Sequence, residues 1–600
     1  MLSFEAVQHA LGWRPVAERG IGSGRTDPVR LLRTSSWSAG LSRYLPAAAM
    51  AAVLSFGPTP AARAAYELPE GERITNVIVI GRGIPQKEQY ELFDPKIGKN
   101  FDLKNFWMRA DLRVRPEYRN HVCFGGGIGV SGNCNVMNAG ATANSLAGKA
   151  NDQFVQQMIR LGIGYDLSPD VNFYLEFIDS RTWGGGGSPF GAGGGGNNGD
   201  PLTHTCGATP STGGRSTCSL GVRAGYMLIR NFAGLKGFSI KAGRQYLVLG
   251  DQSLFGHFDW SNTGFSFDGV MTQYSTRVVD SQFGWFRIAE TDLPQGAPLG
   301  SGQPNIGGTG QAGNAAGDVD LFIFHNQIKT VPGFLIEPYY AYYKNNLGAG
   351  DVSGQGLGTP KHGDQTRHTL GGRVAMKKGG LDWSTEVVYQ FGQMGDTGGT
   401  AATSNPCGPS GTQSKCLHIN AWATRNWIGY TAFTMPWKPR LAFNFDYASG
   451  DGRSNCTLNA AYGSCKTANT FENFYPTNHI HMGYMDVLAW KNMLSLSVNL
   501  QARPTENDHI EIWYTNMNLA SAQDNWYRAS QGVYVFSKAG NTKTHIGDEL
   551  DLVWTHLFMD GKLAFQAAYS HFWPGAYVSE NLGRNAIGQD WAYGQLWINF

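Results

Sequence analysis

Long stretches of this chain alternate apolar and polar residues with a period of two. The segment 441–447 reads Leu-Ala-Phe-Asn-Phe-Asp-Tyr, which places the large apolar side chains on one face. The segments 382–391 and 494–501 follow the same rule. Because successive side chains of a strand point to opposite faces, this period predicts strands with one apolar and one polar face.

About eighteen segments of this kind occur between residue 103 and the end of the chain. Their ends are defined to within a few residues. The predicted strands are 103–116, 151–166, 169–182, 218–231, 236–248, 264–275, 278–290, 317–329, 333–345, 364–377, 379–393, 418–436, 439–449, 489–503, 505–518, 544–557, 559–573 and 589–600.

The connections between these strands alternate between short and long. Short ones, such as Gly379-Gly380 and Asp560-Gly561, are tight turns, whereas the long ones are rich in Gly, Asn or Ser. Membrane β-barrels have short periplasmic turns and long outer loops, which predicts that the long connections lie on the cell exterior. The chain also ends on Phe600 after alternating apolar positions, a common ending for such barrels. The long connections are 117–150, 183–217, 291–316, 346–363, 394–417, 450–488 and 519–543.

Composition narrows the class of protein further. Charged residues make up 16% of the 600 positions, aromatic residues 12%, and Gly occurs 80 times. No run approaches 18 apolar residues beyond the first 60 positions, which excludes a membrane-spanning helix there. The hydrophobic content of 42% is too high for a disordered chain. We therefore expect an all-β fold, a transmembrane antiparallel β-barrel of about 18 strands.

The N-terminal region has the pattern of an export signal. The apolar stretch 44–57 follows Arg30, Arg33 and Arg43, and Ala62-Arg63-Ala64 provides a small-residue cleavage site. We therefore expect three parts: a signal peptide with a long N-terminal basic region (1–64), a segment that is periplasmic or luminal (65–102) and the barrel (103–600). Alternatively, the first 29 residues result from a start codon assigned too far upstream. Cleavage would change the formal charge from +2 to −2, which gives no reason to expect nucleic acid binding. The expected location is the outer membrane of a Gram-negative bacterium.

Eight cysteines fall into four close pairs with spacings of 11, 12, 9 and 9 residues. None forms a C-x-x-C motif, so neither a zinc ribbon nor haem attachment is indicated. On an exported chain this pattern predicts four disulfides within loops, each worth about 2–3 kcal/mol in the chain-entropy model. The pairs are Cys123/Cys134, Cys206/Cys218, Cys407/Cys416 and Cys456/Cys465.

The polar strand faces must line a lumen, because lipid disfavours charge. Most basic positions lie on early strands and most acidic ones on later strands. Two interpretations remain open: the charges set a transverse field that orients solutes, or they pair and stiffen the wall. The inward basic candidates are Arg109, Arg113, Arg115, Arg160, Arg223, Arg373, Lys377 and Arg503, and the acidic ones are Asp111, Glu176, Glu337, Asp382, Glu386, Asp446, Glu511, Glu549 and Asp551.

Sequence motifs of catalysis are absent. The chain has no G-x-S-x-G, no H-E-x-x-H and no Walker A motif, so neither an enzyme nor a cofactor is expected. His479 and His481 are two residues apart and could share a metal. An exposed polar loop is the favoured interpretation, and no metal site is predicted.

Four stretches carry a resemblance to a known family. They are Arg109–Arg119, Asp179–Trp183, residues 243–269 (Gly-Arg-Gln-Tyr, Gly-Asp-Gln-Ser-Leu-Phe-Gly, Trp-Ser-Asn-Thr-Gly and Phe-Asp-Gly) and residues 474–575 (Phe-Tyr-Pro-Thr-Asn, Gly-Tyr-Met-Asp, His-Ile-Gly-Asp-Glu-Leu-Asp and Tyr-Ser-His-Phe-Trp-Pro-Gly). Together they resemble the alginate-export outer-membrane porin family. The resemblance implies a monomeric eighteen-stranded barrel whose basic constriction passes an anionic polysaccharide, with Arg109, Arg113, Arg115, Arg181 and Arg244 in the lumen. The chain departs from the family pattern at Ser253 and Phe265, where further Arg would be expected.

The expected function is a channel for hydrophilic, anionic solutes or for polysaccharide. Export of the cell's own polysaccharide is one form of it. The alternative is a surface binding module in which the barrel anchors disulfide-bonded loops. Expected partners are outer-membrane lipid and the solute, without nucleic acid. The predicted path residues are Arg109, Asp111, Arg113, Arg115, Arg160, Arg181, Arg223, Arg244, Arg373, Glu549 and Asp551.

Overall fold

A computed structural model describes most of the chain beyond residue 104. The predicted signal peptide (1–64) and the segment 65–102 lie outside the described residues, so both stay predictions. The described residues are 105–125, 134, 152–183, 220–262, 264–289, 319–345, 365–395, 416–452, 467–529, 531–538, 540–583 and 585–599.

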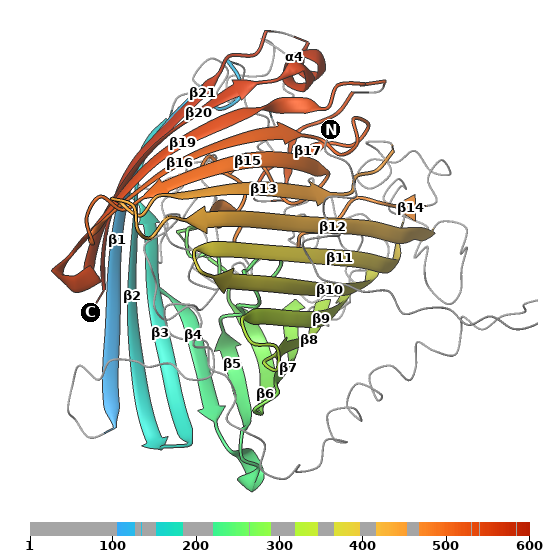
Figure 1. The fold of residues 1–600 in the computed structure, drawn as a ribbon. Helices are drawn as coiled ribbons and strands as arrows, with labels where there is room; N and C mark the ends of the chain where they lie inside the picture. The colour runs from blue at the N-terminus through green and yellow to red at the C-terminus, as the bar shows by residue number, and fades with distance from the viewer. Residues whose placement is uncertain are drawn as a thin grey trace, which may run out of the picture. The chain divides into compact units, whose positions relative to one another are not determined.

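Eighteen long strands form the wall of a barrel, coloured from blue to red along the chain in Figure 1. Each coincides with one of the predicted strands, so the predicted fold class and strand number are confirmed. The strands are β1 (Phe106–Asn120), β2 (Asp152–Ser168), β3 (Val171–Thr182), β4 (Leu220–Ile229), β5 (Phe238–Gln245), β6 (Phe267–Ser275), β7 (Val279–Ala289), β8 (Val319–Ile328), β9 (Phe334–Asn345), β10 (Gln365–Lys378), β11 (Leu381–Gly395), β12 (Cys416–Thr431), β13 (Arg440–Ala448), β15 (Met493–Ala502), β16 (Asp508–Asn518), β19 (His545–Phe558), β20 (Leu563–Pro574) and β21 (Gln589–Asn599).

The wall closes on itself. Each long strand pairs antiparallel with the next along the chain, and β1 also pairs antiparallel with β21. The β1–β21 register places Asp111 opposite Asn599 and Arg119 opposite Trp591. A closed sheet leaves no edge strand with unsatisfied backbone groups, which is the condition for spanning a membrane with strands.

Short elements that the alternation does not predict lie between the long strands. β14 pairs parallel with β12, and β17 pairs with β18 in a separate two-stranded ribbon. None of the described helices is long and apolar enough to span a membrane. These elements are β14 (Thr467–Ala468), β17 (Trp526–Tyr527), β18 (Val533–Val535), α4 (Ala576–Leu582) and the 3-10 turns η4 (Phe232–Gly234), η6 (Asn478–Ile480) and η7 (Met559–Gly561).

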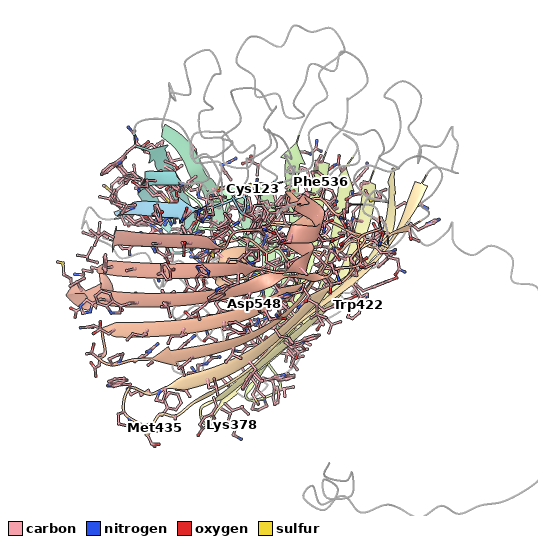
Figure 2. The ribbon with its side chains drawn as sticks, turned by 90° about the horizontal axis from the view of Figure 1, so that it is seen from above. Cys123, Lys378, Trp422, Met435, Phe536 and Asp548 are labelled. Carbon is pink, nitrogen blue, oxygen red and sulfur yellow. A yellow bond between two sulfur atoms is a disulfide. The ribbon has the colours of Figure 1, made fainter. Side chains whose placement is uncertain are left out.

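The two faces of the wall differ as the alternation requires. On β13, Leu441, Phe443 and Phe445 are exposed on the outer face, whereas Asn444 and Asp446 are buried on the inner face. Apolar side chains on the outside suit lipid contact, and polar side chains inside suit a solvated or plugged lumen. The short turns gather at one end of the wall: Met435 and Lys378 lie together in Figure 2, away from Cys123 and Phe536.

Three segments between strands fold into the interior, namely 246–266, 469–492 and 519–538. The first two are joined by a parallel bridge between Phe255 and Tyr475, and the amide of Gly256 donates to the carbonyl of Tyr475 over 2.8 Å. Both touch the inner wall, for example Phe474 against Tyr343.

The assignment of 450–488 and 519–543 wholly to outer loops was therefore wrong. The physical reason is their aromatic content, because Phe471, Phe474, Tyr484 and Trp526 are fully buried. Large apolar side chains in a connection gain more from burial inside the barrel than from exposure to water.

Candidate functional site

The inner face of β1 carries a row of charged side chains. Arg109, Asp111, Arg113 and Arg115 alternate along the strand and all point inward. Arg109 keeps 20% of its side chain exposed and lies 3.7 Å from Asp111 and 3.8 Å from Glu176. Arg113 and Arg115 are buried, so other groups must satisfy their guanidinium donors.

The 246–266 segment supplies the acceptors for both buried arginines. Arg113 donates from Nη1 to the carbonyl of Asp259 over 2.6 Å and from Nη2 to the carbonyl of Ser261 over 3.1 Å. Arg115 donates from Nη1 to the carbonyl of Trp260 over 2.8 Å, and its guanidinium carbon lies 3.7 Å from the centroid of a Trp260 ring. These arginines hold a backbone segment in the lumen.

Two further predicted arginines converge on the carboxylate of Asp259. Arg160 on β2 donates to Asp259 Oδ2 over 2.8 Å and to Asp111 Oδ1 over 2.9 Å. Arg223 on β4 donates to Asp259 Oδ1 over 3.2 Å and to the carbonyl of His257 over 3.0 Å. Arg113, Arg115, Arg160 and Arg223 thus form one group, which we call the arginine cluster.

Burial and the neighbouring charges determine the protonation states of Asp259 and His257 at the centre of the arginine cluster. Burial by itself would raise the pKa of Asp259, but Arg160, His257 and Arg223 outweigh it and hold that pKa well below its usual range. Burial lowers the pKa of His257 to about 4. Near neutral pH, Asp259 is therefore a carboxylate and His257 is neutral.

Arg373 lies apart from the arginine cluster. It projects inward from β10 and donates from Nε to Glu337 Oε2 over 2.7 Å. Nearby, Glu386 accepts hydrogen bonds from Tyr339 over 2.6 Å and from Ser253 over 2.5 Å. Where the family pattern leads one to expect Arg, Ser253 is thus a neutral ligand of an inward carboxylate.

The acidic residues of the late strands hold a different segment. Glu549 accepts a hydrogen bond from the amide of Met485 over 3.0 Å, and Asp551 accepts one from the amide of Tyr484 over 3.4 Å. The Tyr484 hydroxyl donates to Glu511 over 3.1 Å. The predicted path residues Glu549 and Asp551 therefore both bind amides of the 469–492 segment.

Two arginines taken from the family resemblance lie on the opposite face of the wall. Arg181 is 44% exposed, pairs with Asp179 over 2.6 Å and stands opposite Gln157 on the outer face. Arg244 stands opposite Asp268, to which it donates over 2.8 Å, and Asp268 is 50% exposed. Their placement in the lumen was wrong. Odd and even positions of a strand lie on opposite faces, and a motif match does not show on which face a given position lies.

The two histidines of the 469–492 segment do not form a metal pair. His479 lies 3.1 Å from Asp486, and His481 hydrogen-bonds the carbonyl of Asp251 over 2.8 Å. Both are buried, so the exposed loop expected there was wrong. Among the described residues no three His, Cys, Asp or Glu side chains could hold a metal ion.

The sequence analysis missed two inward residues of β1 that the alternation of polar and apolar positions predicts. Glu117 and Arg119 continue the inward row of β1 beyond Pro116. Glu117 accepts from Arg115 over 2.7 Å and from Arg119 over 3.2 Å, so both of its carboxylate oxygens are hydrogen-bonded. Asp259 has no such signal, because it lies between strands.

One of the four predicted disulfides is present in the described part of the chain. Cys123 and Cys134 are joined, and they are near neighbours as expected. The amide of Cys134 donates to the carbonyl of Tyr534 over 2.8 Å. The rings of Phe124, Trp526 and Tyr534 contact one another beside it, so the bridge fixes an aromatic cluster at the end of the barrel that carries the long connections.

The other three predicted disulfides are neither confirmed nor contradicted. Of Cys416, the first residue of β12, only the backbone is described, and the remaining five cysteines of these pairs lie outside the described residues. The pairings therefore stay predictions that rest on sequence spacing alone. They are Cys206 with Cys218, Cys407 with Cys416, and Cys456 with Cys465.

Replacing both Cys123 and Cys134 by Ser is expected to loosen the aromatic cluster beside them and leave the wall intact. The wall depends on ladder hydrogen bonds between strands, which the bridge does not touch. Hydrogen exchange should quicken in residues 531–538, while the folded band on unheated SDS gels remains. Loss of that band in the double variant would contradict the expectation.

These features define a class. A closed antiparallel wall with apolar outer and polar inner faces, and an interior filled by chain segments, is an outer-membrane β-barrel channel, and its location is the Gram-negative outer membrane. A family model described as alginate export matches residues 226–588. The chain belongs to the alginate export family.

Solved outer-membrane proteins resemble the chain more distantly. They include Pseudomonas aeruginosa OccK9 (OpdG), with 10% identity, a TM-score of 0.45 and coverage of 82% of this chain and 97% of that one. Acinetobacter baumannii OccAB1 has 12% identity, a TM-score of 0.43 and coverage of 82% and 96%. At these scores the likeness carries no argument about solute. A comparison with curated protein sequences found no significant match.

Proposed function

We propose that this channel passes anionic solutes or an anionic polysaccharide across the outer membrane. The observation that carries the proposal is the convergence of four arginines from β1, β2 and β4 on one side of the lumen. Arginine stays charged at all physiological pH values and binds carboxylates in a forked geometry. Arg109 extends this cluster with a partly exposed guanidinium.

The family match supports the same conclusion, because its model describes alginate export. Alginate-like polymers carry a carboxylate on each sugar, which suits a row of guanidinium groups. We infer that the protein acts as a monomeric channel without a catalytic step, a cofactor or nucleic acid. The binding-module alternative depends on long connections that lie mostly outside the described residues.

Ion selectivity tests the proposal. In planar bilayers with a salt gradient, the wild-type protein should show a reversal potential that favours anions. The double variant Arg113→Ser/Arg115→Ser should shift that potential toward zero. The shift should shrink in 1 M salt, because screening then acts within about 3 Å.

Arg181→Ser is the matched control. It removes the same charge, but from the outer face of the wall, so it should leave the reversal potential unchanged. A cation-selective wild-type channel, or an equal shift in the control and the double variant, would contradict the proposed function.

A further inference from the structure

The segment 257–262 crosses the arginine cluster with its acceptor groups turned toward the wall. Arg223 binds the carbonyl of His257, Arg113 binds that of Asp259 and Arg115 binds that of Trp260. Peptide carbonyls of this segment thus occupy the positions on the arginines where the anionic groups of a solute would bind. The Arg115 side chain also lies over the Trp260 ring, which stacks on the parallel ring of His479 with 3.7 Å between the centroids.

Asp259 adds a full negative charge at the centre of this contact. Its two carboxylate oxygens are shared between Arg160 at 2.8 Å and Arg223 at 3.2 Å. All three side chains are almost fully buried. A pair of arginines that shares one carboxylate in this manner is a carboxylate-binding site, and here a residue of the chain itself fills it.

Contacts other than those to Asp259 also hold Arg160 and Arg223 in place. Asp111 accepts a hydrogen bond from Arg160 Nε over 2.9 Å, whereas Asp259 binds Nη1, so the two carboxylates use different nitrogens of the guanidinium. Arg223 donates to the hydroxyl of Ser266 over 2.7 Å and lies 4.8 Å from the ring centroid of Tyr246. Both guanidinium groups are therefore held ready for another carboxylate.

We propose that Arg160 and Arg223 form a carboxylate subsite of the transport path, which Asp259 occupies as an internal competitor of the solute. The inference rests on the proposed function, since it requires an anionic solute. A buried guanidinium without an acceptor is costly, whereas exchange of one carboxylate for another preserves its hydrogen bonds. Solute carboxylates can thus displace Asp259 and, with it, the carbonyls of 259–261 from Arg113 and Arg115.

Block of single-channel current by trigalacturonate, a uronate trisaccharide, measures this competition. Asp259→Asn keeps the shape of the side chain and removes its charge. The variant should be half-blocked at about a tenfold lower trigalacturonate concentration than the wild type, because the competing charge is gone. Block by maltotriose, a neutral trisaccharide, should not change.

Asp524→Asn is the matched control. Asp524 is a buried carboxylate of the 519–538 segment whose ligands are Thr470, Tyr527 and backbone amides, so its change should leave trigalacturonate block unaltered. Asp259→Glu should be blocked as the wild type is. Should Asp259→Asn fail to assemble, Arg223→Gln provides the test, with block weakened about tenfold.

The outcomes separate the two proposals. A channel that prefers anions and is blocked by trigalacturonate, but equally in Asp259→Asn and wild type, overturns the subsite and leaves the proposed function standing. Absence of trigalacturonate block in the wild type and all variants, together with cation selectivity, overturns the proposed function itself.

Discussion

Replacement of Phe443 by Arg should abolish most barrel assembly. Phe443 lies at the middle of β13 on the outer face and is 53% exposed, which in the membrane means exposed to lipid. An arginine at the bilayer midplane costs about 2–4 kcal/mol on the lipid face of a barrel. Folding into lipid vesicles, followed by the heat-modifiable shift on SDS gels, measures the loss.

Trp437→Arg provides the comparison, because Trp437 is 62% exposed in the short turn between β12 and β13. There the same charge costs about 0–1 kcal/mol, so assembly should remain close to wild type. Equal assembly of the Phe443 and Trp437 variants would mean that the outer face of β13 does not contact lipid.

Acidification should weaken the docking of the 246–266 segment. The pKa of His257 is about 4 when the segment is docked, against an ordinary value near 6.5, because burial disfavours the charged ring. Between these values the released segment binds more protons than the docked one, so docking is strongest above pH 6.5. The free energy that favours docking of the segment should fall by up to about 3 kcal/mol as the pH falls to 4.

Hydrogen exchange of residues 247–262 at pH 7.5 and pH 4.5, corrected for intrinsic rates, measures the loss of docking. His257→Gln removes the titrating ring and should flatten this pH dependence. The neighbouring groups are Gln252, Asp259, Arg160, Arg223 and Glu176, and the low pKa of Asp259 keeps that carboxylate ionised across the window. An unchanged pH dependence in the variant would assign the effect to another group.

The inward charges have two kinds of partner, other side chains of the wall and the backbone of the interior segments. Some inward charges pair with each other on the inner face of nearby strands, as Arg440 does with Asp382 at 2.5 Å and Arg373 with Glu337. Others hold the interior segments, and they do so by sign: arginines of the early strands bind carbonyls, and carboxylates of the late strands bind the amides of Tyr484 and Met485. The division of charge along the sequence thus orients two segments inside one barrel.

The alternation of residues by itself determined the wall. Each wall residue contacts either lipid or the interior, so the local pattern of apolar and polar residues predicts where each strand lies and which face each side chain is on. All eighteen strands follow from this period of two. The inward orientation of Arg113, Arg115, Arg160 and Arg223 follows from the same rule. Where a motif match replaced the strand register, at Arg181 and Arg244, the face was wrong.

Only the tertiary structure decided what fills the lumen and which groups the arginines bind. Arg113 and Asp259 are 146 residues apart, and no local pattern marks Asp259, because an interior segment follows neither strand nor helix periodicity. The choice between an outer loop and an inward one depends on burial against strands distant in sequence, such as Phe474 against Tyr343. That free energy belongs to the assembled barrel, so the sequence could show the arginines but not their partner.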